Sequence, residues 1–199
     1  MKKSTGKVTA TVFIMLLITV AILFGYFKMT QKPLEEEETV AKTEIEKLLK
    51  KDMEHNYPGT SREVLKLYGR MTQCMYNDNL NEKQVEGLLD QLRKLYDEEL
   101  LEQNPRDTHL ENLYRDIEDY QKHKRKIMSY TVQKSSQIKA YESNGKEYAV
   151  GYMLFITGDD TTALIKTYEK FMLRKDTNGN WKVVGWDLVD PDSIEIEED

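Results

Sequence analysis

Hydrophobic residues follow three different patterns along the chain. An uncharged and largely apolar segment runs from Val8 to Phe27. As a helix it would be about 30 Å long, which matches the hydrocarbon core of a bilayer. Between residues 41 and 127, apolar residues recur at the three- and four-residue spacing of amphipathic helices. From about residue 130, the pattern changes to the two-residue period of β-strands.

The segment at 8–27 predicts a transmembrane helix. A cleaved signal peptide is the alternative, but its apolar region is typically about 7–15 residues long and ends in a small-x-small motif. This segment is longer and no such motif closes it. Lys2, Lys3 and Lys7 precede it and two lysines follow it, so the positive-inside bias predicts a cytoplasmic N-terminus and an extracytoplasmic C-terminal part. We therefore expect a single-pass protein of the cell membrane.

Four amphipathic helices are expected next. The first ends before Pro58, and the third stops near Pro105. Capping-box patterns, which satisfy the free backbone N–H groups of a first turn, open the other three helices. These patterns are Thr60 with Glu63, Asn81 with Gln84, and Thr108 with Glu111. The apolar stripe of the fourth helix reaches Ile127.

Four strands are then expected near residues 130–142, 146–157, 162–175 and 181–189. Their short connections include two Asn-Gly pairs, which suit tight hairpin turns and make neighbouring strands antiparallel. Both faces of the segment at 146–157 are apolar, so this strand should be central. The fold class predicted is α+β, with the four helices packed on one face of a four-stranded antiparallel meander.

The expected division of the chain has five parts. A short cytoplasmic tail (1–7) precedes the membrane segment (8–27), a juxtamembrane acidic linker (28–38) and an extracytoplasmic α+β domain (39–190). The acidic end (191–199) is either a frayed tail or a short charged edge strand. Residues 33–199 contain 24 basic and 35 acidic residues, a net charge of −11. This charge excludes a nucleic-acid binder that relies on bulk positive charge.

Several segments resemble a family of uncharacterised single-pass membrane proteins from Gram-positive bacteria. They include Tyr57-Pro58-Gly59-Thr60, Arg93-Lys94-Leu95-Tyr96 and the terminal Trp181-Lys182-Val183-Val184-Gly185-Trp186. The order of helices and strands, with this last hairpin, is similar to the cone-shaped nuclear transport factor 2-like superfamily. The resemblance implies a cone-shaped domain, whose interior holds a ligand or an active site in other members. It implies no particular activity.

No pattern of catalytic or metal-binding residues is found in the sequence. His55, His109 and His123 lack partners at the spacing of a recognisable metal site. Cys74, the single cysteine, lies on an apolar helical stripe without a partner base. We therefore expect no enzyme activity, no cofactor and no metal.

Two groups of residues are candidates for binding. The first is aromatic: Tyr148, Tyr152, Tyr168, Trp181 and Trp186 lie on three successive predicted strands. Aromatic side chains of this kind suit a pocket or an interface, although they also fill cores between sheets and helices.

The second candidate group is cationic and contains Lys122, Lys124, Arg125 and Lys126. It could contact an anionic lipid headgroup or polymer, or it could simply complement the dipole at a helix C-terminus.

These features predict a non-catalytic, membrane-anchored, extracytoplasmic interaction or assembly module, with a protein partner or self-association and no nucleic acid. The alternative is a small-molecule binder or an enzyme that uses the aromatic interior of the cone. A sensor that signals inward through a partner is a third hypothesis.

Overall fold

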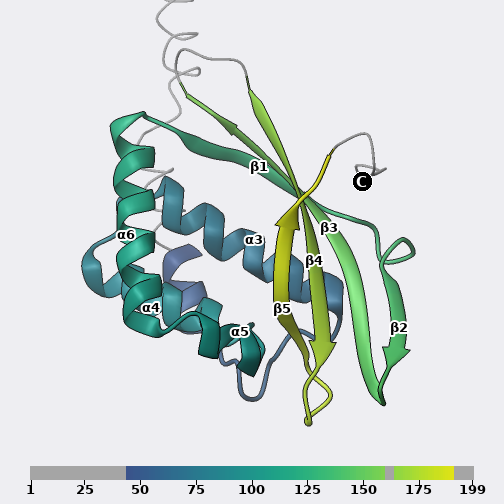
Figure 1. The fold of residues 1–199 in the computed structure, drawn as a ribbon. Helices are drawn as coiled ribbons and strands as arrows, with labels where there is room; N and C mark the ends of the chain where they lie inside the picture. The colour runs from purple at the N-terminus through teal and green to yellow at the C-terminus, as the bar shows by residue number, and fades with distance from the viewer. Residues whose placement is uncertain (1–43, 160–163, 191–199) are drawn as a thin grey trace, which may run out of the picture. The chain divides into compact units, whose positions relative to one another are not determined.

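The computed structural model describes residues 44–159 and 164–190. In this part of the chain, helices come first and an antiparallel sheet second, and the helices lie on one side of the sheet (Figure 1). After a helical segment at 44–49, the elements are α3 (Ser61–Asn77), α4 (Glu82–Arg93), α5 (Glu98–Gln103), α6 (Arg106–Lys122), β1 (Lys126–Val132), β2 (Lys139–Ser143), β3 (Lys146–Gly158), β4 (Ile165–Lys175) and β5 (Trp181–Leu188). The predicted α+β order is confirmed.

Two of the three expected capping boxes are present. Thr60 and Glu63 close the box of α3, and Asn81 and Gln84 close that of α4. The third expectation was wrong, because α6 begins two residues before Thr108 and its N-cap is Pro105. Proline fixes φ near the helical value and has no N–H that needs a partner, so it starts this helix without a side-chain cap.

The third predicted helix is interrupted. Helix α4 ends at Arg93, and α5 starts only at Glu98. Between them the backbone pairs with β5: the N–H of Val183 donates to the carbonyl of Leu95 at 2.8 Å, and the N–H of Asp97 donates to the carbonyl of Val183 at 2.8 Å. The free edge of β5 is thereby paired at Val183, which satisfies the backbone N–H and carbonyl of this residue.

The sheet has five strands, so the prediction of a four-stranded meander was wrong. The strand expected at 130–142 is two strands, β1 and β2, which pair with different parts of the same edge of β3. Ile127, which was expected on the fourth helix, lies in β1. The 13 residues of β3 provide enough edge for both partners. The central position of β3 is confirmed, since β4 pairs with its other edge.

The two faces of the sheet differ in their cover. Ala149, Gly151, Met153 and Phe155 of β3 belong to the face that packs on the helices, which we call the inner face. Neighbouring residues alternate onto the opposite, outer face. Helix α3 crosses the inner face closely: a methyl group added to Gly69 would lie 2.5 Å from the ring of Tyr130 in β1.

The predicted fold class also included a transmembrane helix. No helix within 44–159 and 164–190 is long and apolar enough to cross a membrane, so the architecture of this part is an α+β domain without one. The segment at 8–27, on which that prediction depends, lies outside the described residues. The same holds for the expected tail at 1–7, the linker at 28–38 and the acidic end at 191–199.

Candidate functional site

The aromatic residues selected from the sequence lie on both faces of the sheet. Strand register puts Tyr148, Tyr152 and Tyr168 on the outer face, where Tyr148 stacks on Tyr141 of β2 with ring centroids 5.5 Å apart. Trp186 pairs with Phe171 and therefore lies on the inner face, and Trp181 also packs against the helix-covered core. The sheet thus separates the three tyrosines from Trp186.

Trp186 belongs to a cluster of aromatic rings between the sheet and the helices. Its ring centroid lies 5.8 Å from that of Phe171, 5.9 Å from that of Tyr68 and 6.0 Å from that of Tyr96. Tyr68 comes from α3 and Tyr96 from the segment between α4 and α5. Together with Glu169, these four residues form what we call the aromatic site.

One end of the inner face is open to solvent. On β4 and β5, Phe171, Leu173 and Val183 are fully buried. Further along, Glu169 is only partly covered, Trp186 is 38% exposed and Leu188 is 73% exposed. The helices therefore cover only part of the inner face, and the aromatic site lies where this cover ends.

Glu169 is the one acidic residue of β4 and lies on the inner face, opposite Met153 of β3. Its Oε2 atom is buried and has no hydrogen-bond partner among the residues that the structure describes. Burial raises the pKa of this carboxyl to about 7. A buried carboxylate oxygen without a partner is costly, so it indicates a position where a ligand can supply the missing contact.

The tyrosines around Glu169 keep their protons. Burial raises the pKa of Tyr68, Tyr96 and Tyr120, and the negative charge of Glu169 adds to the rise in each case. Tyr120 of α6 also lies against Tyr76 of α3, with 4.6 Å between the ring centroids. The site therefore presents neutral phenols and a single ionisable acid.

The importance of Glu169 was missed in the sequence, although a signal was present. Alternate residues of β4 face the helices, namely Thr167, Glu169, Phe171 and Leu173. Of these four, Glu169 alone carries a charge. An acid at an inward position of an alternating strand is unusual because charged groups are rarely buried without a partner. This position could have been selected on that basis.

A second candidate site is a pocket of about 940 Å³ between α3, the loop before it and β1. Its lining includes Lys51, Arg62, Lys66 and Arg70, with Glu63 as the one acid among the lining residues. We call it the cationic pocket. It was not predicted, because its residues come from segments that are far apart in the sequence.

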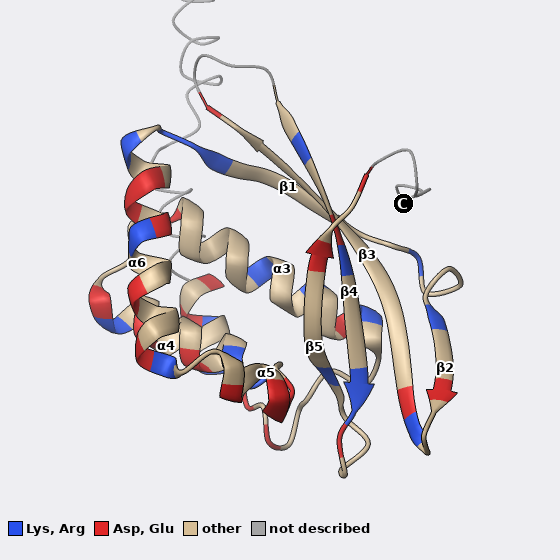
Figure 2. Cartoon of the chain, in the orientation of Figure 1, with Lys and Arg blue, Asp and Glu red and all other residues tan. Residues whose placement is uncertain are grey.

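The third candidate group is the set of basic residues selected from the sequence. Lys122 ends α6, Lys126 begins β1, and Lys124 between them has a positive φ of 51°. Arg125 forms an ion pair with Asp119, with 3.1 Å between nitrogen and oxygen. Figure 2 shows basic residues gathered at this corner of the fold.

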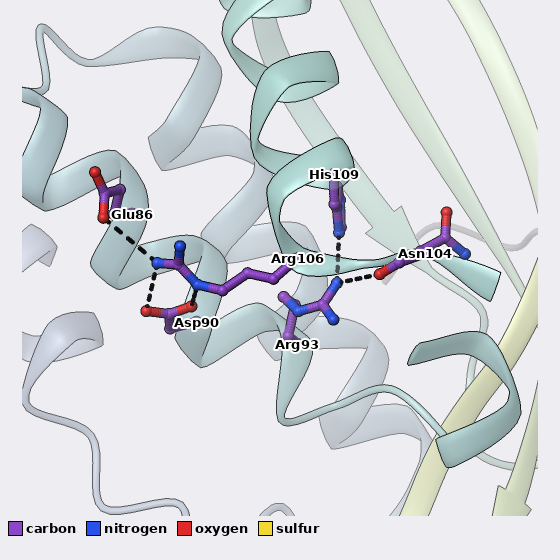
Figure 3. Close-up of polar contacts among 6 residues, drawn as sticks. All are labelled: Glu86, Asp90, Arg93, Asn104, Arg106 and His109. Carbon is purple, nitrogen blue, oxygen red and sulfur yellow. Dashed lines mark hydrogen bonds and ion pairs between the residues drawn. The ribbon is translucent and has the colours of Figure 1, made fainter. Parts of the chain in front are cut away.

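His109 has a structural contact on α6 (Figure 3). Its Nδ1 atom lies 3.2 Å from a guanidinium nitrogen of Arg93, which also donates to the carbonyl of Asn104 at 2.7 Å. The imidazole stacks on the ring of Tyr96, at 5.9 Å between centroids. Burial and the Arg93 charge lower the pKa of His109. This histidine is therefore neutral at pH 7. It contacts Tyr96 but is not part of the aromatic site.

Arg106, in the first turn of α6, forms a separate group of polar contacts (Figure 3). Its Nε donates to Asp90 at 2.7 Å, and its terminal nitrogen lies 3.4 Å from Glu86. Because all three side chains are substantially exposed, these ion pairs mainly orient α6 against α4.

The remaining titratable candidates show no arrangement for catalysis. The thiol of Cys74 donates to Asp78 at 3.1 Å, and burial raises its pKa far above the usual range. His55 pairs with Asp52 and His123 with Asp119, both at the surface. No group of three or more His, Cys, Asp or Glu within the described ranges could hold a metal ion.

These observations define the class of the described part: an α+β domain with one layer of helices on a five-stranded antiparallel sheet. The chain belongs to the family described as Domain of unknown function (DUF6715), whose model matches residues 1–186. No curated protein matches the sequence. The expected membership of a family without an assigned activity is confirmed, whereas the expected bacterial source and nuclear transport factor 2-like fold stay predictions.

Proposed function

We propose that this protein is a non-catalytic ligand-binding module whose ligand sits in the aromatic site. The observation that carries the proposal is the carboxyl of Glu169, which has a buried oxygen without a hydrogen-bond partner in the described residues and lies beside aromatic rings. Partial exposure of Trp186 supports access from solvent. A resemblance to the cone-shaped superfamily, whose interior holds ligands in other members, is consistent with this position.

The chemistry of the site favours an organic cation with an apolar body. Faces of Trp and Tyr rings attract ammonium groups, most strongly where water is excluded. A carboxylate beside them supplies the opposite charge, and a bound cation offsets the unfavourable burial of Glu169. Trp186 and Leu188, which are 38% and 73% exposed on the same face, supply apolar surface for the rest of such a ligand.

The proposal includes a location at a cell membrane. This part of it rests on the sequence, in which residues 8–27 are uncharged and largely apolar. The lysine bias favours a cytoplasmic N-terminus, so that the binding domain would lie on the extracytoplasmic side of a bacterial envelope. Reporter fusions at the C-terminus test this orientation. Activity from a reporter that requires the cytoplasm would contradict it.

A second candidate function is assembly with a protein partner or a second copy of the chain. It is favoured by the outer face of the sheet, where Tyr141 is 45% exposed and Met172 is 38% exposed beside the half-buried Tyr148, Tyr152 and Tyr168. In-cell cross-linking of the tagged full-length chain tests it, with a chain that ends after residue 32 as the control. Recovery of the same proteins with both chains would contradict it.

Binding in the aromatic site can be measured with benzylammonium, the protonated form of benzylamine, which joins an aromatic ring to an ammonium group that can donate a hydrogen bond to Oε2 of Glu169. A Trp181→Phe variant leaves Trp186 as the fluorescent tryptophan, since the chain has two. We expect saturable quenching of Trp186 by this probe. Adding Glu169→Gln should weaken binding about tenfold or more, because the charge is lost while the shape is retained.

Two controls make this result specific. Glu118 is an exposed acid of α6, and Glu118→Gln should leave the affinity unchanged. Benzyl alcohol, which has no charge, should bind much more weakly than the cation. Equal affinities of the Glu169→Gln and parent chains, or of the two probes, would contradict an organic cation as the ligand.

A further inference from the structure

The cationic pocket concentrates positive charge in a chain whose net charge is −6. Four of its lining residues are basic and one is acidic. The acid, Glu63, directs its Oε2 atom to the backbone N–H groups of Gly59 and Thr60, at 3.0 and 3.1 Å. The carboxylate of Glu63 is therefore engaged in capping the N-terminus of α3.

Three of the basic residues form a stripe along α3. Arg62, Lys66 and Arg70 are spaced by four residues, so their side chains lie one above the other on the same side of the helix. Like charges at this spacing destabilise a helix by a few tenths of a kcal/mol per pair. The ion pair between Arg70 and Glu44 offsets part of this repulsion, and a bound anion would offset the rest.

Neighbouring groups hold the two arginines of the stripe in place. Nε of Arg62 donates to the carbonyl of Gln133 at 3.0 Å, and Nε of Arg70 donates to Glu44 at 3.0 Å. Lys66 between them is exposed, and its ammonium group has no hydrogen bond or ion pair within 44–159 and 164–190. The pocket thus combines two positioned guanidinium groups with one accessible ammonium.

We propose that the cationic pocket binds a phosphate group. The planar guanidinium group of arginine can donate two hydrogen bonds at once to the oxygens of a phosphate, and the ammonium group of lysine adds a localised positive charge. The pocket of about 940 Å³ has room for more than a bare ion, and Leu67, Val132 and Ile156 give it an apolar side. The chemistry therefore fits a phosphoester with an organic substituent, either a soluble phosphate ester or the headgroup of an anionic phospholipid. This site is separate from the aromatic site and does not depend on the function proposed there.

Two calorimetric titrations of the full-length chain in neutral detergent test the proposal and distinguish the sources. One uses glycerol 3-phosphate, and the other uses dihexanoyl phosphatidylglycerol. Binding of the first assigns the pocket to soluble phosphate esters, and binding of the second alone assigns it to a lipid headgroup. In either case Lys66→Ala should weaken binding about tenfold, the usual effect of removing a charged hydrogen bond, and added salt should weaken it further.

Lys83→Ala provides the matched control, because Lys83 is exposed on α4 and does not line the pocket. The Lys83→Ala chain should bind the probe, whichever of the two binds, with the same affinity as the parent chain. Three results would each overturn the proposal: no binding of either probe, unchanged binding by the Lys66→Ala chain, or equal weakening by Lys83→Ala. Substitutions at Lys66 leave the arginine contacts in place, so a loss of binding would not reflect loss of the fold.

Discussion

Asp97 and Arg174 join the helical layer to the sheet through a nearly buried ion pair. Nε of Arg174 in β4 donates to Oδ2 of Asp97 at 3.1 Å, and the two side chains are 11% and 7% exposed. Asp97 is also the N-cap of α5, where it accepts from the backbone N–H of Glu99. One carboxylate therefore starts a helix and fastens it to the sheet.

Asp97→Ala should lower the free energy of unfolding by about 3–5 kcal/mol. Removing one partner leaves the other charge poorly compensated in a nearly buried place, which is the costly way to break such a pair. Glu99 also contacts Arg174, at 2.9 Å, but its side chain is 58% exposed. Glu99→Ala is the matched comparison and should cost less than about 1 kcal/mol. Denaturant unfolding of the full-length chain measures the loss in both variants. Equal losses would contradict the prediction that burial makes the Asp97–Arg174 pair the more important of the two.

Gly69→Ala should also destabilise the fold, by up to about 2 kcal/mol. Alanine favours a helix over glycine by about 1 kcal/mol, but its methyl group would lie 2.5 Å from the Tyr130 ring, and overpacking typically costs about 1–3 kcal/mol. At Gly185 of β5 an added methyl group meets no atom within 4 Å. Gly185→Ala should therefore be neutral or slightly stabilising. A Gly69→Ala chain as stable as the parent would show that α3 and β1 can separate without loss.

Thr60 and Thr108 look alike in the sequence, since each is followed by glutamate three residues later. Only Thr60 accepts the N–H of the third residue, Glu63, at 3.2 Å. Thr60→Ala should therefore cost about 1 kcal/mol. Thr108 is exposed within α6, so Thr108→Ala should change the unfolding free energy little. Thermal or denaturant unfolding checks the difference, and equal losses would contradict the cap assignment.

Local patterns were good predictors where one short segment decides the outcome. Asn144 and Gly145 have φ values of 52° and 71°, as a two-residue hairpin turn requires, and the residues before and after them pair directly. The amphipathic stripes likewise predicted correctly which side of α3 and of α4 faces the core. Such features need no knowledge of distant parts of the chain.

Features that depend on distant segments could not be predicted in the same way. The break between α4 and α5 exists because Leu95 and Asp97 pair with Val183, and the separation of β1 from β2 depends on how much edge β3 offers. The aromatic candidates were selected by residue type, whereas the face of each residue follows from register. A bulge between Met172 and Leu173 changes that register along β5.

The pH dependence of stability should report the burial of Glu169. Burial raises the pKa of its carboxyl from 4.5 to about 7, so the folded state holds the proton more tightly than the unfolded state. The stability that this group contributes is therefore fully present below about pH 4.5, and it is lost as the pH rises through about 7. The contribution of this group is at most about 3 kcal/mol.

Glu169→Gln removes the titration while it keeps the size of the side chain. We expect this variant to be more stable than the parent chain at pH 8 and to lose most of the advantage near pH 5, where the parent carboxyl is largely protonated. Glu118→Gln, at an exposed position of α6, should leave the pH profile of the parent unchanged. Benzylammonium at one fixed concentration should stabilise the parent at pH 8 much more than the Glu169→Gln chain, since ligand binding adds to stability only where it favours the folded state. Parallel pH profiles of the parent and Glu169→Gln chains would show that this carboxyl is not buried in solution, and the aromatic site would then lose its charged partner.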